Sequence, residues 1–171
     1  MTTSPFSSPL SLADRFGLKA PFAALHHVAL VTNDMRKTVA FYRDVLGSEI
    51  AMSHRLAREG NERHYFITVA PNVVFAFFEF PNAEMPEFQP AMIAKTGRAL
   101  DHIAFLVPDE DAFTSMYTRL QGQVAHLSEI RDLGSVRAFF FADPNNIVLE
   151  VMVEKGNGFT FPQLGDPDPA Y

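Results

Sequence analysis

An internal repeat constrains the fold of this chain more than any other feature of its sequence. The segment ALHHVALVTND at 24–34 can be laid over ALDHIAFLVPD at 99–109, with identities at Ala, Leu, His, Ala and Asp. Each copy is an apolar run of strand length that ends at an Asp suited to cap a helix. An amphipathic helical pattern and three strand-like runs follow in both halves. The sequence therefore predicts two βαβββ modules. Each module alone would leave one apolar face of its sheet half exposed, and packing against the other module would bury it.

The turn signals and apolar patterns set the expected elements of each module. In the first module we expect a helix from Met35 to the stop at Gly47, and strands at 24–32, 49–56, 63–69 and 72–80. In the second we expect a helix from Pro108 to Gly122, and strands at 99–107, 124–130, 136–141 and 147–153. The expected fold class is α+β.

Segments rich in Pro, Gly and Ser divide the chain. We expect an N-terminal arm at 1–22, a first module at 23–81, a linker at 82–97, a second module at 98–154 and a C-terminal tail at 155–171. The two modules would form one cooperative domain at 23–154.

Composition excludes several classes of function. The chain of 171 residues has no Cys, so it has no thiolate metal site, disulfide or cysteine nucleophile, and a metal ion must be held by His, Asp or Glu. A net charge of -6 without a basic cluster argues against nucleic acid as a partner. No apolar run is long enough to cross a membrane and the start does not resemble a signal peptide, so we expect a cytoplasmic protein. Phosphate-loop and serine-hydrolase motifs are also absent from the sequence.

Four residues form the candidate metal site. His27 and His102 occupy equivalent positions in the first strand of each module, whereas strand alternation sends the neighbouring His26 to the other face. Glu79 and Glu150 are lone acids in the apolar last strands, where an ionised carboxylate needs a partner or a cation. The separation of Glu79 from Glu150 is shorter than that of the two histidines, so a bulge or a shifted strand end is needed to align Glu79.

Each residue also has a structural interpretation. A lone His in a strand is more often a surface or satisfied core residue than a ligand, and a lone Glu more often faces water. The pair His64-Tyr65 could place a proton donor in the cup or be an exposed cross-strand pair. His54 and His126 are expected to face solvent, and Arg137 to form a surface ion pair.

The residues from Leu25 to Val153 resemble the vicinal oxygen chelate superfamily of glyoxalases, bleomycin resistance proteins and dioxygenases. The resemblance rests on LHHVALVTNDMRKTVAFYRDVLG, on LDHIAFLVPD and on the closing FADPNNIVLEVMV. It implies a glyoxalase-like cup around one divalent metal ion (Fe, Mn, Ni, Zn or Co), with His27, Glu79, His102 and Glu150 as ligands. It also implies a homodimer.

The resemblance leaves several functions open. The leading expectation is a lyase or isomerase of glyoxalase type that binds a small, partly apolar substrate through neighbouring oxygens, with the metal as Lewis acid and Glu150 or Glu79 as the catalytic base. The alternatives are an Fe(II) ring-cleaving dioxygenase and a non-catalytic protein that binds a drug or antibiotic. The strand VRAFFFA has Phe where the dioxygenases have a Tyr, which disfavours ring cleavage.

The chain contains 17 Phe and no Trp. Many of these phenylalanines lie on the last two strands of each module, beside the candidate acids. With alternating faces, about half of them should line the cup and half should pack under the helices.

Overall fold

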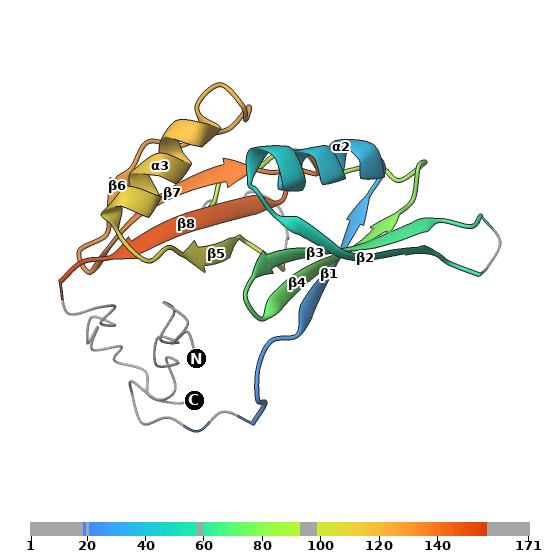
Figure 1. Ribbon diagram of the computed structural model, residues 1–171. Helices are drawn as coiled ribbons and strands as arrows, with labels where there is room; N and C mark the ends of the chain where they lie inside the picture. The colour runs from blue at the N-terminus through green and yellow to red at the C-terminus, as the bar shows by residue number, and fades with distance from the viewer. Residues whose placement is uncertain (1–18, 20, 58–59, 93–98, 157–171) are drawn as a thin grey trace.

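The computed structural model describes residues 19, 21–57, 60–92 and 99–156. They form two four-stranded mixed sheets, in the strand orders β1-β4-β3-β2 and β5-β8-β7-β6. Figure 1 shows α2 and α3 on the same side of the two sheets. The expected pair of modules in an α+β fold is confirmed. No helix in the described ranges is long and apolar enough to cross a membrane.

The first module runs from β1 to β4. Its elements are β1 (His27–Thr32), α2 (Met35–Ala40), a π-helical turn η1 (Phe41–Val45), β2 (Glu49–Arg55), β3 (Arg63–Ala70) and β4 (Val73–Glu79). The carboxylate of Asp34 caps α2 by accepting the N–H of Lys37 at 3.0 Å. Gly47, with φ of 81°, ends the helical segment in the left-handed conformation that glycine adopts without strain.

The second module repeats this order after residue 98. Its elements are β5 (Ile103–Leu106), α3 (Glu110–Leu120), β6 (Arg131–Asp132), β7 (Val136–Ala142) and β8 (Val148–Glu154). Asp109 caps α3 as Asp34 caps α2, accepting the N–H of Ala112 at 2.8 Å. In both modules the first strand runs parallel to the last, Ala29 beside Ala76 and Ala104 beside Glu150.

One expected strand is almost absent. The sequence predicts a strand at 124–130, but the ladder with β7 contains Arg131 and Asp132 alone, and from 124–130 Ser128 donates its N–H to the carbonyl of Phe140 at 2.8 Å. The reason lies at Ser128, whose hydroxyl accepts the N–H of Phe140 at 2.9 Å in place of a backbone carbonyl. The chain before Ser128 therefore leaves the sheet edge.

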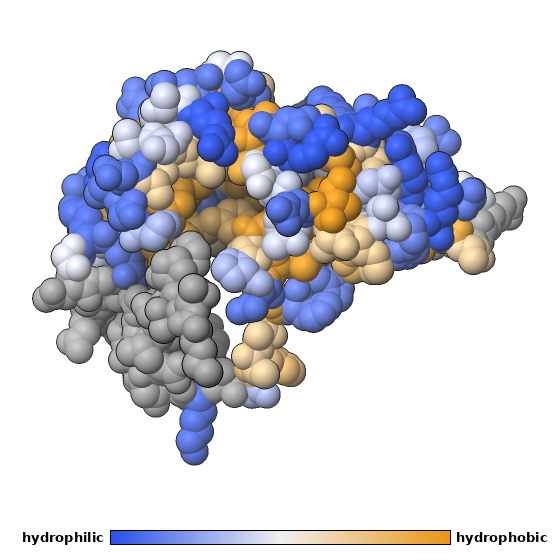
Figure 2. Space-filling view, viewed as in Figure 1, coloured by the Kyte–Doolittle hydropathy of each residue, from blue (hydrophilic) through white to orange (hydrophobic). Residues whose placement is uncertain are grey.

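The phenylalanines divide between the two faces of the sheets as alternation predicts. Phe75, Phe77, Phe139 and Phe141 are buried in one core that spans both modules beneath the helices. Polar residues cover the outer sides of α2 and α3, whereas apolar residues reach the surface between the modules (Figure 2). Burial of aromatic side chains supplies much of the folding free energy.

Buried polar groups fix the modules against each other. The hydroxyl of Tyr42 donates to Asp143 at 3.1 Å, and the amide of Asn145 donates to Thr38 at 3.2 Å. Asn145 also donates to Asp143, so that the junction is a connected network. Such a network favours one relative placement of the modules, because any other leaves buried polar groups without partners.

Candidate metal centre

Each sheet has an open face that its helix does not cover. In β1, Leu30 and Thr32 are buried while His27, Ala29 and Val31 are exposed. In β5, Ala104 and Leu106 are likewise exposed. His102, directly before β5, lies on the same side, because it contacts Glu150, the partner of Ala104. The two histidines predicted from the repeat therefore lie on the open faces of separate sheets.

His102 and Glu150 form the centre of the candidate site. The Nε2 atom of His102 lies 2.9 Å from a carboxylate oxygen of Glu150. Its Nδ1 atom lies 2.6 Å from the carboxylate of Asp101, which also accepts the N–H of Met92 at 2.8 Å. The imidazole is thus oriented from one side by Asp101, and its other nitrogen is presented to Glu150.

Glu150 sits in an environment that favours a nearby cation. Its side chain is only 6% exposed and lies between the apolar residues Leu149 and Val151 of β8. Burial raises the pKa of the Glu150 carboxyl above its ordinary value, and His102 opposes this effect. A positive charge beside the pair would stabilise the ionised carboxylate.

His27 has different neighbours. Its Nδ1 atom lies 2.8 Å from Nδ1 of His26, and its ring meets Phe66 edge-on with centroids 6.5 Å apart. Strand alternation predicts His26 and His27 on opposite faces. His26 precedes β1, however, so the alternation within the strand does not fix the direction of its side chain. At equivalent positions of the repeat, the residue before each histidine thus contacts its Nδ1 atom: His26 in the first module and Asp101 in the second.

The structure places Glu79 away from this site. The residue of β4 equivalent to Glu150 is Ala76, because both pair with the matching alanine of the first strand. Glu79 is three residues further along β4, on the helix-facing side, so the bulge that would align it is not found there. Its carboxylate accepts the N–H of Met35 at 3.0 Å and a bidentate pair from Arg63.

The contacts of Glu79 account for its burial without a metal. Hydrogen bonds from Arg63 hold the pKa of the Glu79 carboxyl below its ordinary value against the opposing effect of burial, and the Met35 N–H adds to this lowering. A carboxylate at the first residue of α2 also interacts favourably with the helix dipole. Within the described residues, no three His, Asp or Glu side chains converge to hold a metal ion.

Two further histidines lie on the open face of the first sheet. His54 and His64 are paired across β2 and β3, with Nε2 and Nδ1 3.3 Å apart, and His64 stacks on Phe78 at 3.7 Å. Burial lowers the pKa of His64, and so do His54 and His27. The Nε2 atom of His64 is buried without a hydrogen-bond partner among the described residues. His64 is therefore a neutral imidazole with an unused nitrogen.

Some site residues were not found by sequence reasoning. Asp101 orients His102. The repeat contained a signal for it, because the second copy has Asp101 at the position where the first copy has His26. Arg131 lies over the ring of Phe140 at 5.4 Å. His126 is exposed, as expected, and its ring also stacks on Phe88 at 3.7 Å. No periodic pattern marks these last contacts, because they join segments far apart in the sequence.

Comparisons with known proteins agree with this architecture. Residues 24–151 match the family model of the glyoxalase/bleomycin resistance protein/dioxygenase superfamily. The chain belongs to this superfamily. An uncharacterised protein of Escherichia coli K12, YaeR, is 30% identical over 133 residues, which cover 74% of this chain and 93% of that protein.

Solved structures share the superfamily fold at low sequence identity. A glyoxalase/bleomycin resistance protein/dioxygenase domain from Frankia has a TM-score of 0.64 and 19% identity, covering 78% of this chain and 99% of its own. A mutant of the fosfomycin resistance protein FosX from Listeria monocytogenes, solved with Mn(II) and 1S,2S-dihydroxypropylphosphonic acid, has a TM-score of 0.59 and 20% identity, covering 80% and 94%.

Proposed function

We propose that this superfamily member is a divalent-metal enzyme of glyoxalase type, acting on a small, partly apolar substrate through neighbouring oxygens. The observation that carries the proposal is the contact between Nε2 of His102 and the buried carboxylate of Glu150, at 2.9 Å. An imidazole and a carboxylate on one open sheet face are ligands that Fe, Mn, Ni, Zn and Co share. Mn(II) in the FosX complex supports the same class of metal.

The donor set fits a divalent ion. The nitrogen of His102 that faces Glu150 is the one left free when Asp101 accepts the Nδ1–H. In metal sites, a histidine that binds the metal through one ring nitrogen commonly donates its other ring N–H to a carboxylate, as His102 does to Asp101. Ala104, beside Glu150 on β5, is exposed and has a small side chain.

The third ligand would be His27 of a second copy. Within one chain, His27 lies on the first sheet while His102 and Glu150 lie on the second, and both open faces carry exposed apolar residues. Val31 and Met52 are 41% and 51% exposed on the first face, and Leu106 is 47% exposed on the second. A homodimer that packs the first module of one copy against the second module of the other would bury these residues and bring the ligands together.

The chain's own residues would divide the chemistry. A bound metal ion would act as a Lewis acid that stabilises negative charge developing on a substrate oxygen. Glu150, whose pKa burial raises, would accept a proton from the substrate carbon and hold it on its carboxylate. His64, neutral and with a free Nε2 on the opposing open face, would be a second proton acceptor. Glu79 has no part in this proposal, because Arg63 and Met35 occupy its carboxylate.

The Phe140 ring weighs against the ring-cleaving alternative. Strand β7, on which the resemblance to dioxygenases calls for a Tyr, has phenylalanines instead, and Phe140 is the one that pairs with Glu150 on β8. A phenyl ring cannot transfer a proton, so the lyase or isomerase class is favoured.

Elemental analysis tests the metal site. Protein purified without chelators or an affinity tag should contain a stoichiometric divalent metal, and the metal should be lost in His102→Ala and Glu150→Gln. Loss of metal from a Glu79→Gln variant as complete as from Glu150→Gln would contradict the assignment. Full retention of metal in His102→Ala would contradict the proposed function itself.

Mixed dimers test the shared site. His27→Ala and His102→Ala should each fail to bind metal, but unfolding and refolding them together should restore about one quarter of the sites. A hybrid dimer has one intact site only if the histidines come from different copies. Recovery of no metal on mixing would place all ligands in one chain.

A further inference from the structure

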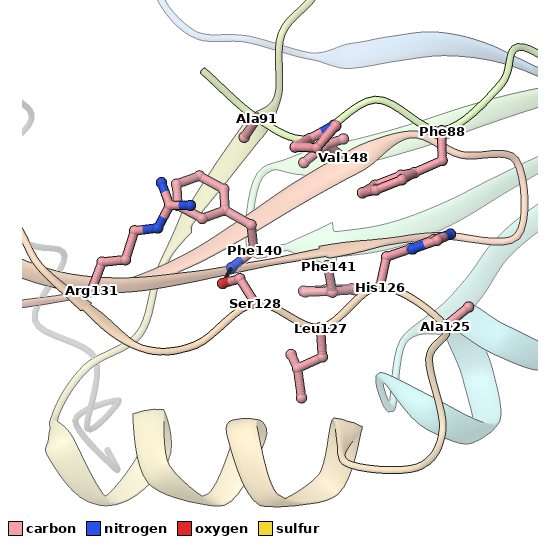
Figure 3. A pocket seen from close by; sticks show the side chains of 11 residues that line it. Phe88, Ala91, Ala125, His126, Leu127, Ser128, Arg131, Phe140, Phe141 and Val148 are labelled. Atoms are coloured by element: carbon pink, nitrogen blue, oxygen red, sulfur yellow. Dashed lines mark hydrogen bonds between the residues drawn. The ribbon is translucent and has the colours of Figure 1, made fainter. Parts of the chain in front are cut away.

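A pocket of about 300 Å³ opens on the second module, beside the candidate metal centre. It exists because the chain before Ser128 leaves the edge of β7 instead of pairing with it. The segment that precedes β5 closes the opposite side, where Phe88 and Ala91 pack against Phe140 and Val148. In Figure 3, Arg131 lies at one end of the pocket and the stacked rings of Phe88 and His126 at the other.

The charge in this pocket has one sign. Among the described residues that line it, Arg131 is the one permanently charged side chain, and none is Asp or Glu. The guanidinium lies 5.4 Å from the centre of the Phe140 ring, and within the described part of the chain no carboxylate pairs with it. In a protein of net charge -6, an acid-free pocket with one cation is suited to an anion.

Apart from Ser128, whose hydroxyl accepts the N–H of Phe140, the remaining described lining is apolar or aromatic. The rings of Phe88 and His126 are stacked in parallel, 3.7 Å apart and inclined by 3°. Phe140 forms the wall between this stack and Arg131 (Figure 3). The volume is at the lower end of the range for small-molecule sites, enough for one substituted ring.

Phe140 connects the pocket to the candidate metal centre. Its ring meets that of His102 edge-on with centroids 5.4 Å apart, and its backbone pairs with Glu150. Val148 lies two residues before Glu150 on the same face of β8. A molecule in the pocket therefore lies beside the His102–Glu150 pair.

We propose that this pocket is the substrate pocket and that it takes a small aromatic or similarly apolar carboxylate. The carboxylate pairs with the Arg131 guanidinium, whose planar array of N–H donors matches two carboxylate oxygens. The apolar body lies along Phe140 toward the Phe88–His126 stack. This role as substrate pocket rests on the proposed function, whereas binding in the pocket does not require a metal.

Ligand-observed fluorine NMR tests the inference with 4-fluorobenzoate and its neutral counterpart 4-fluorobenzamide. The full chain is treated with EDTA, so that no metal ion can hold the carboxylate. We expect the benzoate to bind about tenfold more tightly than the amide, from a charge-assisted hydrogen-bonded pair at a partly exposed site. Arg131→Gln should weaken the benzoate to the level of the amide and leave the amide unchanged, and Phe88→Ala should weaken both.

Arg137→Gln is the matched control. Arg137 is opposite Asp132 in the β6–β7 pair, but it pairs with Glu110 and lies over Phe113 on the helix side. Its loss removes the same charge from the same sheet, and should leave benzoate affinity unchanged. Circular dichroism on each variant checks that the fold is retained.

Several results would overturn the inference. They are no binding of benzoate to the wild type, equal binding of the two probes, full benzoate affinity in Arg131→Gln, and an equal loss in Arg137→Gln. Metal content is measured separately on untreated protein. Benzoate binding without any metal site would overturn the proposed function and leave the pocket standing, and the reverse result would overturn the pocket alone.

Discussion

Replacing Glu79 by Gln separates a structural role from a metal-binding role for this residue. The carboxylate of Glu79 is 8% exposed and accepts a bidentate pair from Arg63 together with the N–H of Met35, the first residue of α2. The amide of Gln has nearly the same shape and retains one oxygen acceptor. The substitution therefore removes the charge and one acceptor, with little change in packing.

The expected loss follows from these contacts. Hydrogen bonds to charged groups contribute about 1.5–3 kcal/mol, and neutral ones about 0.5–1.5 kcal/mol. Weakening the two bonds from Arg63 and losing a favourable charge at a helix N-terminus should lower the free energy of unfolding by about 2 kcal/mol. For a chain of this size, this corresponds to a decrease in Tm of about 4–8 °C.

The pH dependence of the loss has a defined sign. The pKa of Glu79 in the folded protein is below its ordinary value, so its stabilisation is fully present above the unfolded-state pKa of about 4.3. It is lost as the pH falls through the lower folded-state pKa, where the carboxylate takes up a proton. The difference between wild type and Glu79→Gln should be equal at pH 7 and pH 5.5 and should shrink below about pH 4.

Urea unfolding followed by circular dichroism measures this difference, since the chain has no Trp to report by fluorescence. Glu49→Gln is the control, because Glu49 is an exposed glutamate in β2 of the same sheet and should change stability little. Arg63→Gln should cost a similar amount as Glu79→Gln, and the double variant less than the sum. An unchanged unfolding midpoint in Glu79→Gln at pH 7 would refute the reasoning.

Three other substitutions test the site, the junction and the core. Asp101→Asn should weaken metal binding about tenfold, because His102 loses the charged partner of its Nδ1 atom. Competition with a chelating dye measures the affinity, and an unchanged affinity would show that Asp101 has no role in the site. Tyr42→Phe should lower the free energy of unfolding by about 1–2 kcal/mol, since Asp143 loses a buried donor, and a neutral effect in urea would count against the junction network. Phe139→Ala should cost about 3–5 kcal/mol by the cavity it leaves in the core, and a loss below about 1 kcal/mol would contradict its full burial.

The fold was largely predictable from sequence because its signals are local and repeated. The helix caps at Asp34 and Asp109 lie where the pattern predicted them. The strand at 124–130 was predicted wrongly. Its apolar pattern is that of a strand, but the Phe140 N–H donates to the side-chain hydroxyl of Ser128 instead of to a backbone carbonyl of this segment. Propensity does not encode that competition.

Sequence by itself determined the residue types that can act here: no cysteine, and histidines at equivalent strand positions of a repeat. Tertiary structure decided which of them meet. His102 contacts Glu150. Glu79 lies three residues beyond the position equivalent to Glu150, so it faces the helix side and pairs with Arg63. Strand register, and the contacts between segments far apart in the chain that form the Arg131 pocket, depend on how the whole molecule packs, and no local pattern carries that information.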